Sequence, residues 1–177
     1  LANGGYEVKP RLTLDENVNT GIKLSTDFET FYDPIYEEHP LLGKRLFRNQ
    51  ENINFVKEAM FASTNEPGGT SYSSRFNEKD YQYAGKTGTS QTKRITQAQR
   101  EADLEQTSLP YLDRDHALFV AFAPYENPRY AISVLVEHGG SGSSAAAPVA
   151  KKVIGKLIER HNLRMAKKNS LGLNTNV

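Results

Sequence analysis

The sequence of 177 residues contains no cysteine and no tryptophan. Without cysteine the chain has no disulfide, no thiolate nucleophile and no cysteine-ligated zinc site, and it carries no sign of its redox compartment. No apolar stretch approaches the ~18 residues of a membrane span, because the longest covers only residues 117–123. The 22 basic and 21 acidic residues leave a net charge of +1, which argues against a domain that binds nucleic acid.

The start of the sequence also lacks an initiator methionine and a signal segment. The chain begins Leu-Ala-Asn-Gly-Gly, and an Asn-Gly-Gly sequence is typical of a turn that follows another element. We therefore expect the chain to begin inside a domain. Its length fits one domain or part of a larger one.

Hydrophobic patterning predicts helices and strands in alternation. A helical repeat predicts a helix over about 50–63, which turn residues at 65–69 bring to an end. Two nearly continuous apolar runs, 116–123 and 130–138, predict strands joined by a hairpin loop. Because these runs do not alternate with polar residues, we expect both faces of the strands to be covered. A last helix is predicted from about 146 to 161, followed by a tail that frays.

The sequence Lys-Thr-Gly at positions 86–88 is the strongest indication of function. Hydroxyl residues and a flanking tyrosine favour a strand here, although two glycines weaken that signal. Gly88 allows another backbone to approach closely, so an extended peptide can pair with this strand. Thr87 and Thr89 can donate hydrogen bonds to a carboxylate, and Lys86 supplies positive charge. A backbone N–H of the strand can serve as an oxyanion donor.

Two other interpretations of this stretch remain. The first is a solvated strand with a surface lysine. The second is the end of a nucleotide-binding P-loop, because Gly85 precedes Lys86 and Thr87. That motif requires a glycine where this chain has Asp80, and a helix where Gly88 is followed by poor helix formers. Nucleotide binding is therefore the weakest alternative.

Lys-Thr-Gly is also the third motif of the serine acyltransferases that include penicillin-binding proteins and serine β-lactamases. Four ordered stretches resemble the transpeptidase domain of class B penicillin-binding proteins: ANGG (2–5), NEPGGT (65–70), AGKTGTSQ (84–91) and DHALFVAFAP (115–124). Residues 129–140 and 146–150 are similar to the penicillin-binding protein 2 branch, which acts in cell elongation. The resemblance spans about residues 1–162.

The resemblance implies an α+β fold, in which an antiparallel sheet is flanked by helices. It implies three adjacent strands and a terminal helix, at 84–92, 116–124, 130–138 and 146–162. Residues 1–162 would be the incomplete C-terminal part of a transpeptidase domain. Residues 163–177 would be a basic and polar tail.

The activity that the resemblance implies is serine-type D,D-transpeptidation of peptidoglycan. A serine forms an acyl-enzyme with the D-Ala-D-Ala end of a stem peptide, and β-lactam antibiotics acylate the same serine. Lys86 would act electrostatically, Thr87 and Thr89 would hold the substrate carboxylate beside Gly88, and the Thr89 N–H would complete the oxyanion hole. No cofactor or metal is implied. The implied partners include membrane proteins of the elongation complex, and the implied location is the periplasmic face of the bacterial inner membrane, with an N-terminal helix as anchor.

The first two motifs of that family, Ser-x-x-Lys and Ser-x-Asn, match only at residues 90–93 and 63–65, in the wrong order. Ser90 lies on the same predicted strand as Lys86, and Ser63 lies at the end of a predicted helix. We therefore expect the nucleophilic serine and its base lysine to lie outside this chain, which alone would be inactive. The alternative is a non-catalytic module or degenerate homologue that binds stem peptides or a partner.

The histidines and one run of charges complete the candidate residues. The four histidines show no metal-ligand spacing. His116 and His138 stand at predicted strand ends, where we expect them to pack or to form hydrogen bonds. The charged residues 113–115 either are solvated or shape the loop beside the Lys86 strand. Since charge runs are usually solvated, the first interpretation is favoured.

Overall fold

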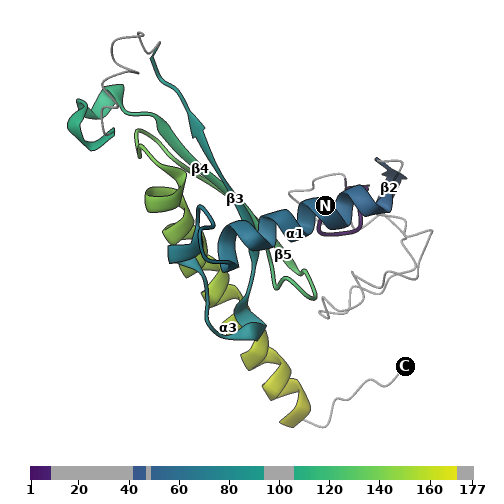
Figure 1. Cartoon of the computed structure of the whole chain (residues 1–177). Helices are drawn as coiled ribbons and strands as arrows, with labels where there is room; N and C mark the ends of the chain where they lie inside the picture. The colour runs from purple at the N-terminus through teal and green to yellow at the C-terminus, as the bar shows by residue number, and fades with distance from the viewer. Residues whose placement is uncertain (9–41, 47–48, 94–105, 171–177) are drawn as a thin grey trace, which may run out of the picture. The chain divides into compact units, whose positions relative to one another are not determined.

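A computed structural model describes residues 1–8, 42–46, 49–93 and 106–170 of the chain (Figure 1). The chain divides into two compact units, residues 1–59 and 60–177. Helix α1 (Gln50–Asn65) begins in the first unit and ends in the second, and it confirms the helix predicted over about 50–63.

The first unit contains a small antiparallel pair of strands. β1 (Tyr6–Val8) pairs with β2 (Leu42–Arg45). The predicted Asn-Gly-Gly turn precedes β1: the Asn3 side chain accepts the Gly5 N–H at 3.0 Å, and both glycines have positive φ (71° and 89°). Such φ values favour glycine, so the sequence specifies this turn locally. The remainder of the expected extended run, residues 9–12, lies outside the described residues.

The second unit is built on a three-stranded antiparallel sheet, in the order β3-β4-β5. Its strands are β3 (Ala84–Ser90), β4 (His116–Ala123) and β5 (Tyr130–Val136). All three expected strands are confirmed, with β3 and β5 each ending two residues earlier than expected. Figure 1 shows α3 (Ala147–Ser170) lying along one side of this sheet.

Small residues let α3 pack closely on the sheet. Alternate residues of β4 point toward the helix, and Phe119 among them is fully buried. The other members of this core are mainly alanines of β4 and α3, together with Ile154 and Ile158. Tyr83, at the start of β3, is also fully buried; its hydroxyl donates to the Ser74 carbonyl at 2.8 Å, and burial raises the pKa of its phenol well above the usual range.

The opposite face of the sheet is more exposed than expected. Along β5, half-buried and exposed residues alternate, and Leu135 is 57 % exposed; on β4, Val120 is 46 % exposed. The expectation that both faces are covered is therefore wrong for this part of β5. An apolar run predicts a strand from its residue types, but it does not determine what packs on each face.

Helix α3 also differs from the sequence prediction at both ends. It is preceded by a π-helical turn, Gly142–Ala146, and it continues to Ser170, where a fraying tail was expected from Leu163 onward. Residues 164–167 are arginine, methionine, alanine and lysine, which are good helix formers, and cations are favourable near a helix C-terminus. Residues 171–177 of the expected tail lie outside the described residues.

Candidate functional site

The Lys-Thr-Gly motif lies on a strand edge that is open to solvent. Within the described ranges, β3 pairs with β4 and has no strand on its other side. Lys86 and Thr89 are exposed, and Thr87 and Gly88 are partly exposed. The structure therefore brings the four predicted site residues together on one accessible edge.

The strand repeat separates these side chains by face. Because successive residues of a strand alternate, Thr87 and Thr89 share one face, and Lys86 projects from the other. The Lys86 Nζ nevertheless folds back: it donates to the Thr87 carbonyl at 2.9 Å and lies 3.4 Å from the Thr87 Oγ1. A positive charge thus sits beside the first of two hydroxyls that face the same way. This arrangement suits a bound carboxylate.

The backbone of β3 is held close to its neighbours by two glycines. A Cβ at Gly85 would lie 2.3 Å from Cζ of Phe119, so the Phe119 ring occupies that space. A Cβ at Gly142, in the π-helical turn, would lie 2.4 Å from the Leu118 carbonyl oxygen and 2.8 Å from that of Gly88. The turn before α3 therefore lies in direct contact with the backbone of the motif.

We predict that Gly142→Ala destabilises the fold and displaces β3 at Gly88. The added methyl meets two backbone oxygens, which cannot rotate away as a side chain can. Overpacking of this kind costs about 1–3 kcal/mol, measured as a loss in the free energy of unfolding in urea. Gly88→Ala is the milder comparison, since its nearest contact would be the Leu118 Cβ at 3.3 Å. Equal stability of Gly142→Ala and the unsubstituted chain would contradict this packing.

A buried carboxylate organises the loop at the far end of β3. Asp115 is 6 % exposed. Its carboxylate accepts hydrogen bonds from the Gln106 side chain at 3.1 Å and the Thr92 backbone N–H at 3.3 Å, and the Gln106 side chain accepts the Asp115 N–H at 2.8 Å. The favoured interpretation of residues 113–115 as a solvated run is therefore wrong at Asp115. Its bonds to Thr92 and Gln106 support the other interpretation, in which this residue shapes the loop.

The two histidines at the strand ends form hydrogen bonds, as expected. The His138 backbone N–H donates to His116 Nδ1 at 2.9 Å, and His138 Nδ1 bonds the Arg114 carbonyl at 3.0 Å. Within the described part of the chain, no group of three or more histidine, aspartate or glutamate side chains has the arrangement of a metal site.

Neither rejected motif match has the geometry of a nucleophile. Ser90 ends strand β3, and Lys93 forms an ion pair with Asp113. Ser63 lies in the last turn of α1 with a buried hydroxyl, and Asn65 donates to the Tyr83 carbonyl at 2.9 Å. These placements support the rejection of both matches, which stays a prediction. The P-loop alternative is wrong, because the chain continues as a strand through Thr87 to Ser90.

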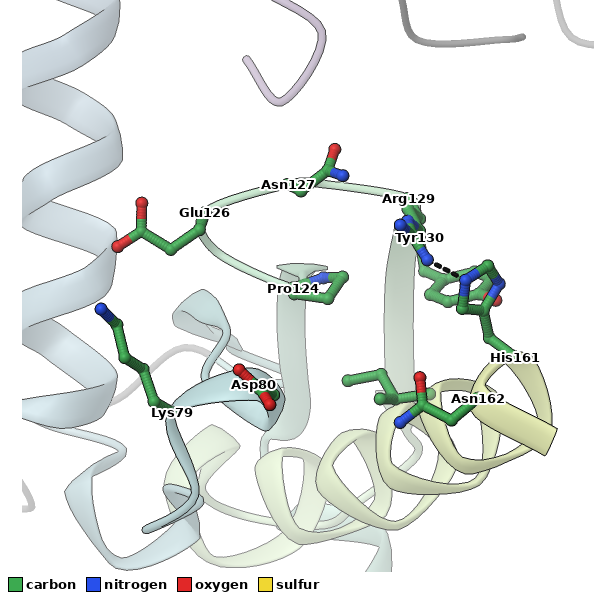
Figure 2. Close-up of a pocket in the computed structure, with 10 residues that line it drawn as sticks. Lys79, Asp80, Pro124, Glu126, Asn127, Arg129, Tyr130, His161 and Asn162 are labelled. Atoms are coloured by element: carbon green, nitrogen blue, oxygen red, sulfur yellow. Dashed lines mark hydrogen bonds between the residues drawn. The ribbon is translucent and has the colours of Figure 1, made fainter. Parts of the chain in front are cut away.

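A separate pocket of about 250 Å³ lies where β4 ends and β5 begins (Figure 2). The loop between these strands and the C-terminal half of α3 line it, and Figure 2 shows Arg129 directed at His161, to which it is hydrogen-bonded. None of the four motif residues reaches this pocket. The candidate site is therefore the open edge of β3.

Sequence reasoning found the motif residues and missed the groups that support them. Gly142 belongs to a glycine- and serine-rich stretch, which is typical of a simple connection between a strand and a helix. Asp115 belongs to a charged stretch that reads as solvated. The one available signal was position, since both stretches directly follow or precede a predicted strand. Among the described residues, no helix combines the length and apolarity needed to cross a bilayer.

Comparison with known proteins places this geometry in context. The model of the penicillin binding protein transpeptidase domain matches residues 1–155. A curated relative, peptidoglycan D,D-transpeptidase MrdA of Salmonella typhimurium, is 38 % identical over 104 residues, which are 59 % of this chain and 16 % of that protein. The chain thus spans about a sixth of the length of this relative.

Two solved structures are also similar to this chain. In a complex of penicillin-binding protein PBP2 with MreC from Helicobacter pylori, the matching chain is 32 % identical with a TM-score of 0.55, over 70 % of this chain and 20 % of that one. PBP2 of Pseudomonas aeruginosa, solved with WCK 5153, is also 32 % identical with a TM-score of 0.51, over 70 % and 23 % of the two chains. The expected α+β transpeptidase fold is confirmed.

Proposed function

Since the chain belongs to the penicillin-binding protein transpeptidase family, we propose that it supplies the substrate strand of a peptidoglycan D,D-transpeptidase. The observation that carries this proposal is the exposed edge of β3, where Lys86, Thr87 and Thr89 stand next to one another. Relatives of this chain bear the name D,D-transpeptidase. The motif alone would not carry the proposal.

The substrate is a stem peptide that ends in D-Ala-D-Ala, bound in extended form along β3. Main-chain hydrogen bonds give such strand addition its affinity. The hydroxyls of Thr87 and Thr89 donate to the terminal carboxylate, and the Lys86 ammonium attracts it. Because Gly88 has no side chain, the peptide backbone can approach the strand between the two threonines.

The reaction is acyl transfer to a serine that lies outside these 177 residues. The serine oxygen attacks the carbonyl of the penultimate D-Ala, the terminal D-Ala leaves with the proton, and an acyl-enzyme ester remains. The Thr89 N–H contributes to the oxyanion hole, while Lys86 stabilises the developing negative charge. An amine of a second stem peptide then displaces the serine and forms the cross-link. A β-lactam acylates the same serine by opening of its ring.

The domain, location and partners follow from the same proposal. Residues 1–162 form the C-terminal part of the transpeptidase domain, and residues 163–177 extend beyond it. The complete protein works at the periplasmic face of the inner membrane, held by an N-terminal helix. Because one solved relative is a complex of PBP2 with MreC, a membrane protein of the elongation machinery is the proposed partner.

Labelling with fluorescent penicillin tests the proposal. The full-length protein is expected to become covalently labelled, and the 177-residue chain is expected to remain unlabelled because it lacks the serine. Ser90→Ala in the full-length protein should leave labelling unchanged, since Ser90 ends a strand and Lys93, the lysine of its motif match, is paired with Asp113. Labelling of the 177-residue chain at Ser90 would contradict the assignment.

A non-catalytic peptide-binding module is the second candidate, because the two serine motif matches, at Ser63 and Ser90, lie at the end of a helix and at the end of a strand. The two candidates differ in the full-length protein. A binding module would retain a stem peptide without forming an ester, so penicillin would not label it. A Ser-x-x-Lys sequence at a helix start upstream of Leu1 would favour the enzyme.

A further inference from the structure

Residues 137–142, which follow β5 and end at the first residue of the π-helical turn before α3, are here called the strap. It is tied to the start of β4 by a bond between two histidines. The His138 backbone N–H donates to His116 Nδ1 at 2.9 Å, and the two rings meet edge to face with centroids 4.7 Å apart. An imidazole nitrogen can accept a hydrogen bond from an N–H only if that nitrogen carries no proton. The structure therefore holds His116 with Nδ1 unprotonated.

The strap keeps a backbone conformation that needs such support. His138 has φ of 52°, in the left-handed region that few residues other than glycine adopt. Strained conformations of this kind persist where several contacts fix them. Here His138 Nδ1 bonds the Arg114 carbonyl at 3.0 Å, and the Gly140 N–H donates to the Asp115 carbonyl at 2.8 Å. His116 supplies the third bond of this set.

The strap also reaches the candidate site. Gly142 lies against the carbonyl oxygens of Leu118 and Gly88, and a Cβ built on it would be 3.1 Å from the Thr87 Cβ. His116 itself stands opposite Ser90 in the β3–β4 register. His116 is thus connected to the motif in two ways: through its register position opposite Ser90, and through the strap, which contacts Thr87 and Gly88.

We propose that His116 is a positioning residue: its unprotonated Nδ1 fixes the strap, and the strap fixes Thr87 and Gly88 on the substrate strand. The consequence for catalysis rests on the proposed function. Protonation of Nδ1 removes the acceptor, frees the His138 N–H and lets the strap move away from β3. Binding of peptide or β-lactam therefore weakens when Nδ1 gains a proton.

The charged and titratable groups around His116 and His138 do not replace the bond between the His138 N–H and His116 Nδ1. The Asp115 carboxylate is already bonded to Gln106 and Thr92, and the Arg114 guanidinium donates to the Leu109 and Thr107 carbonyls. Other neighbouring groups are the Tyr111 ring, 5.1 Å from that of His138, Glu137, whose carbonyl accepts from the Tyr111 hydroxyl, and the Asp113–Lys93 pair. No carboxylate in the described chain is hydrogen-bonded to the His116 ring.

Two variants of the full-length protein separate the acceptor from the ring. His116→Asn keeps an acceptor oxygen at the position of Nδ1 and cannot be protonated, whereas His116→Phe keeps a ring without an acceptor. At about pH 7.5, we expect His116→Phe to lower the penicillin acylation rate constant about five- to tenfold, and His116→Asn less than about twofold. On acidification, the unsubstituted protein should approach the Phe variant, while the Asn variant stays above both.

His161→Phe is the matched control, because it removes an imidazole at the other end of the sheet, beside Arg129. Each acylation rate constant is normalised to the fraction of that protein that can be acylated. Partial unfolding of a variant therefore does not lower its measured rate constant. The proposal is overturned if His116→Phe matches the unsubstituted protein at about pH 7.5, or if the unsubstituted and Asn proteins lose activity in parallel on acidification.

Amide hydrogen exchange of the 177-residue chain tests the same bond without catalysis. His116→Phe should speed exchange at Gly88–Ser90 and at 139–142, and His116→Asn should not. If no protein is acylated, the proposed function fails, and the exchange rates still decide the role of His116. Unchanged exchange in His116→Phe would overturn the positioning role even if acylation is normal.

Discussion

Replacing Lys86 with alanine is expected to lower penicillin acylation of the full-length protein by about 100- to 1,000-fold, the range found when one preorganised electrostatic group is removed from an acyl-transfer site. Lys86 is exposed, and its Nζ is hydrogen-bonded to the neighbouring Thr87. The free energy of unfolding should therefore change by no more than about 0.5 kcal/mol. Loss of activity without loss of stability is the signature of a residue that acts on the substrate.

The control is Lys152→Ala, which removes an exposed lysine of α3. It should leave acylation unchanged, because α3 covers the sheet and does not form its open edge. Lys86→Arg adds a second comparison: it keeps the charge and changes its shape, so an intermediate rate is expected. Normal acylation of Lys86→Ala would remove Lys86 from the proposed mechanism.

Phe119→Ala should cost about 3–5 kcal/mol of unfolding free energy, the usual range for loss of a buried phenylalanine. Phe119 is fully buried at the centre of the core, where its ring meets Tyr83 edge to face with centroids 6.2 Å apart. Val120→Ala, at the next position of β4, is the control and should cost less than about 1 kcal/mol because Val120 is 46 % exposed. Urea titration of the three chains measures both values.

A second substitution tells cavity formation apart from a general loss of structure. Gly85→Ala alone should destabilise, since its Cβ would lie 2.3 Å from the Phe119 ring. In a Phe119→Ala background that ring is gone, so the same methyl enters the vacated space. The double variant should therefore be more stable than the sum of the two single changes indicates. Additive effects would show that Gly85 and Phe119 do not share this space.

The sequence was sufficient to predict those helices and strands whose ends long-range packing does not modify. β4 begins and ends where its apolar run does, at His116 and Ala123, because a run that contains two phenylalanines and a valine is bounded by charged residues and proline. The motif residues Lys86–Thr89 were also located correctly on a strand. Their accessibility was not predictable, since it depends on which strands lie beside β3.

The supporting groups could not be predicted, for a physical reason. Asp115 is charged, and a charged side chain is buried only where specific donors reach it. Those donors are Thr92, which follows β3, and Gln106, which begins a short 3₁₀ helix, and the sequence does not reveal that they meet at Asp115. The π-helical turn at Gly142 likewise depends on contact with the β3 backbone. Local propensity describes neither, because both arise from residues that are distant along the chain.

The open edge of β3 has an evolutionary consequence. A ligand that pairs with this edge is held partly by backbone N–H and C=O groups, which no amino-acid substitution removes, apart from replacement by proline. Thr87 and Thr89 can be exchanged, but the peptide groups between them remain. Mutation can therefore discourage such a ligand only by crowding or bending the strand, and under the proposed function any such change also affects the substrate peptide on the same edge. Inhibitors that imitate main-chain pairing here should accordingly be harder to escape than inhibitors that depend on side chains.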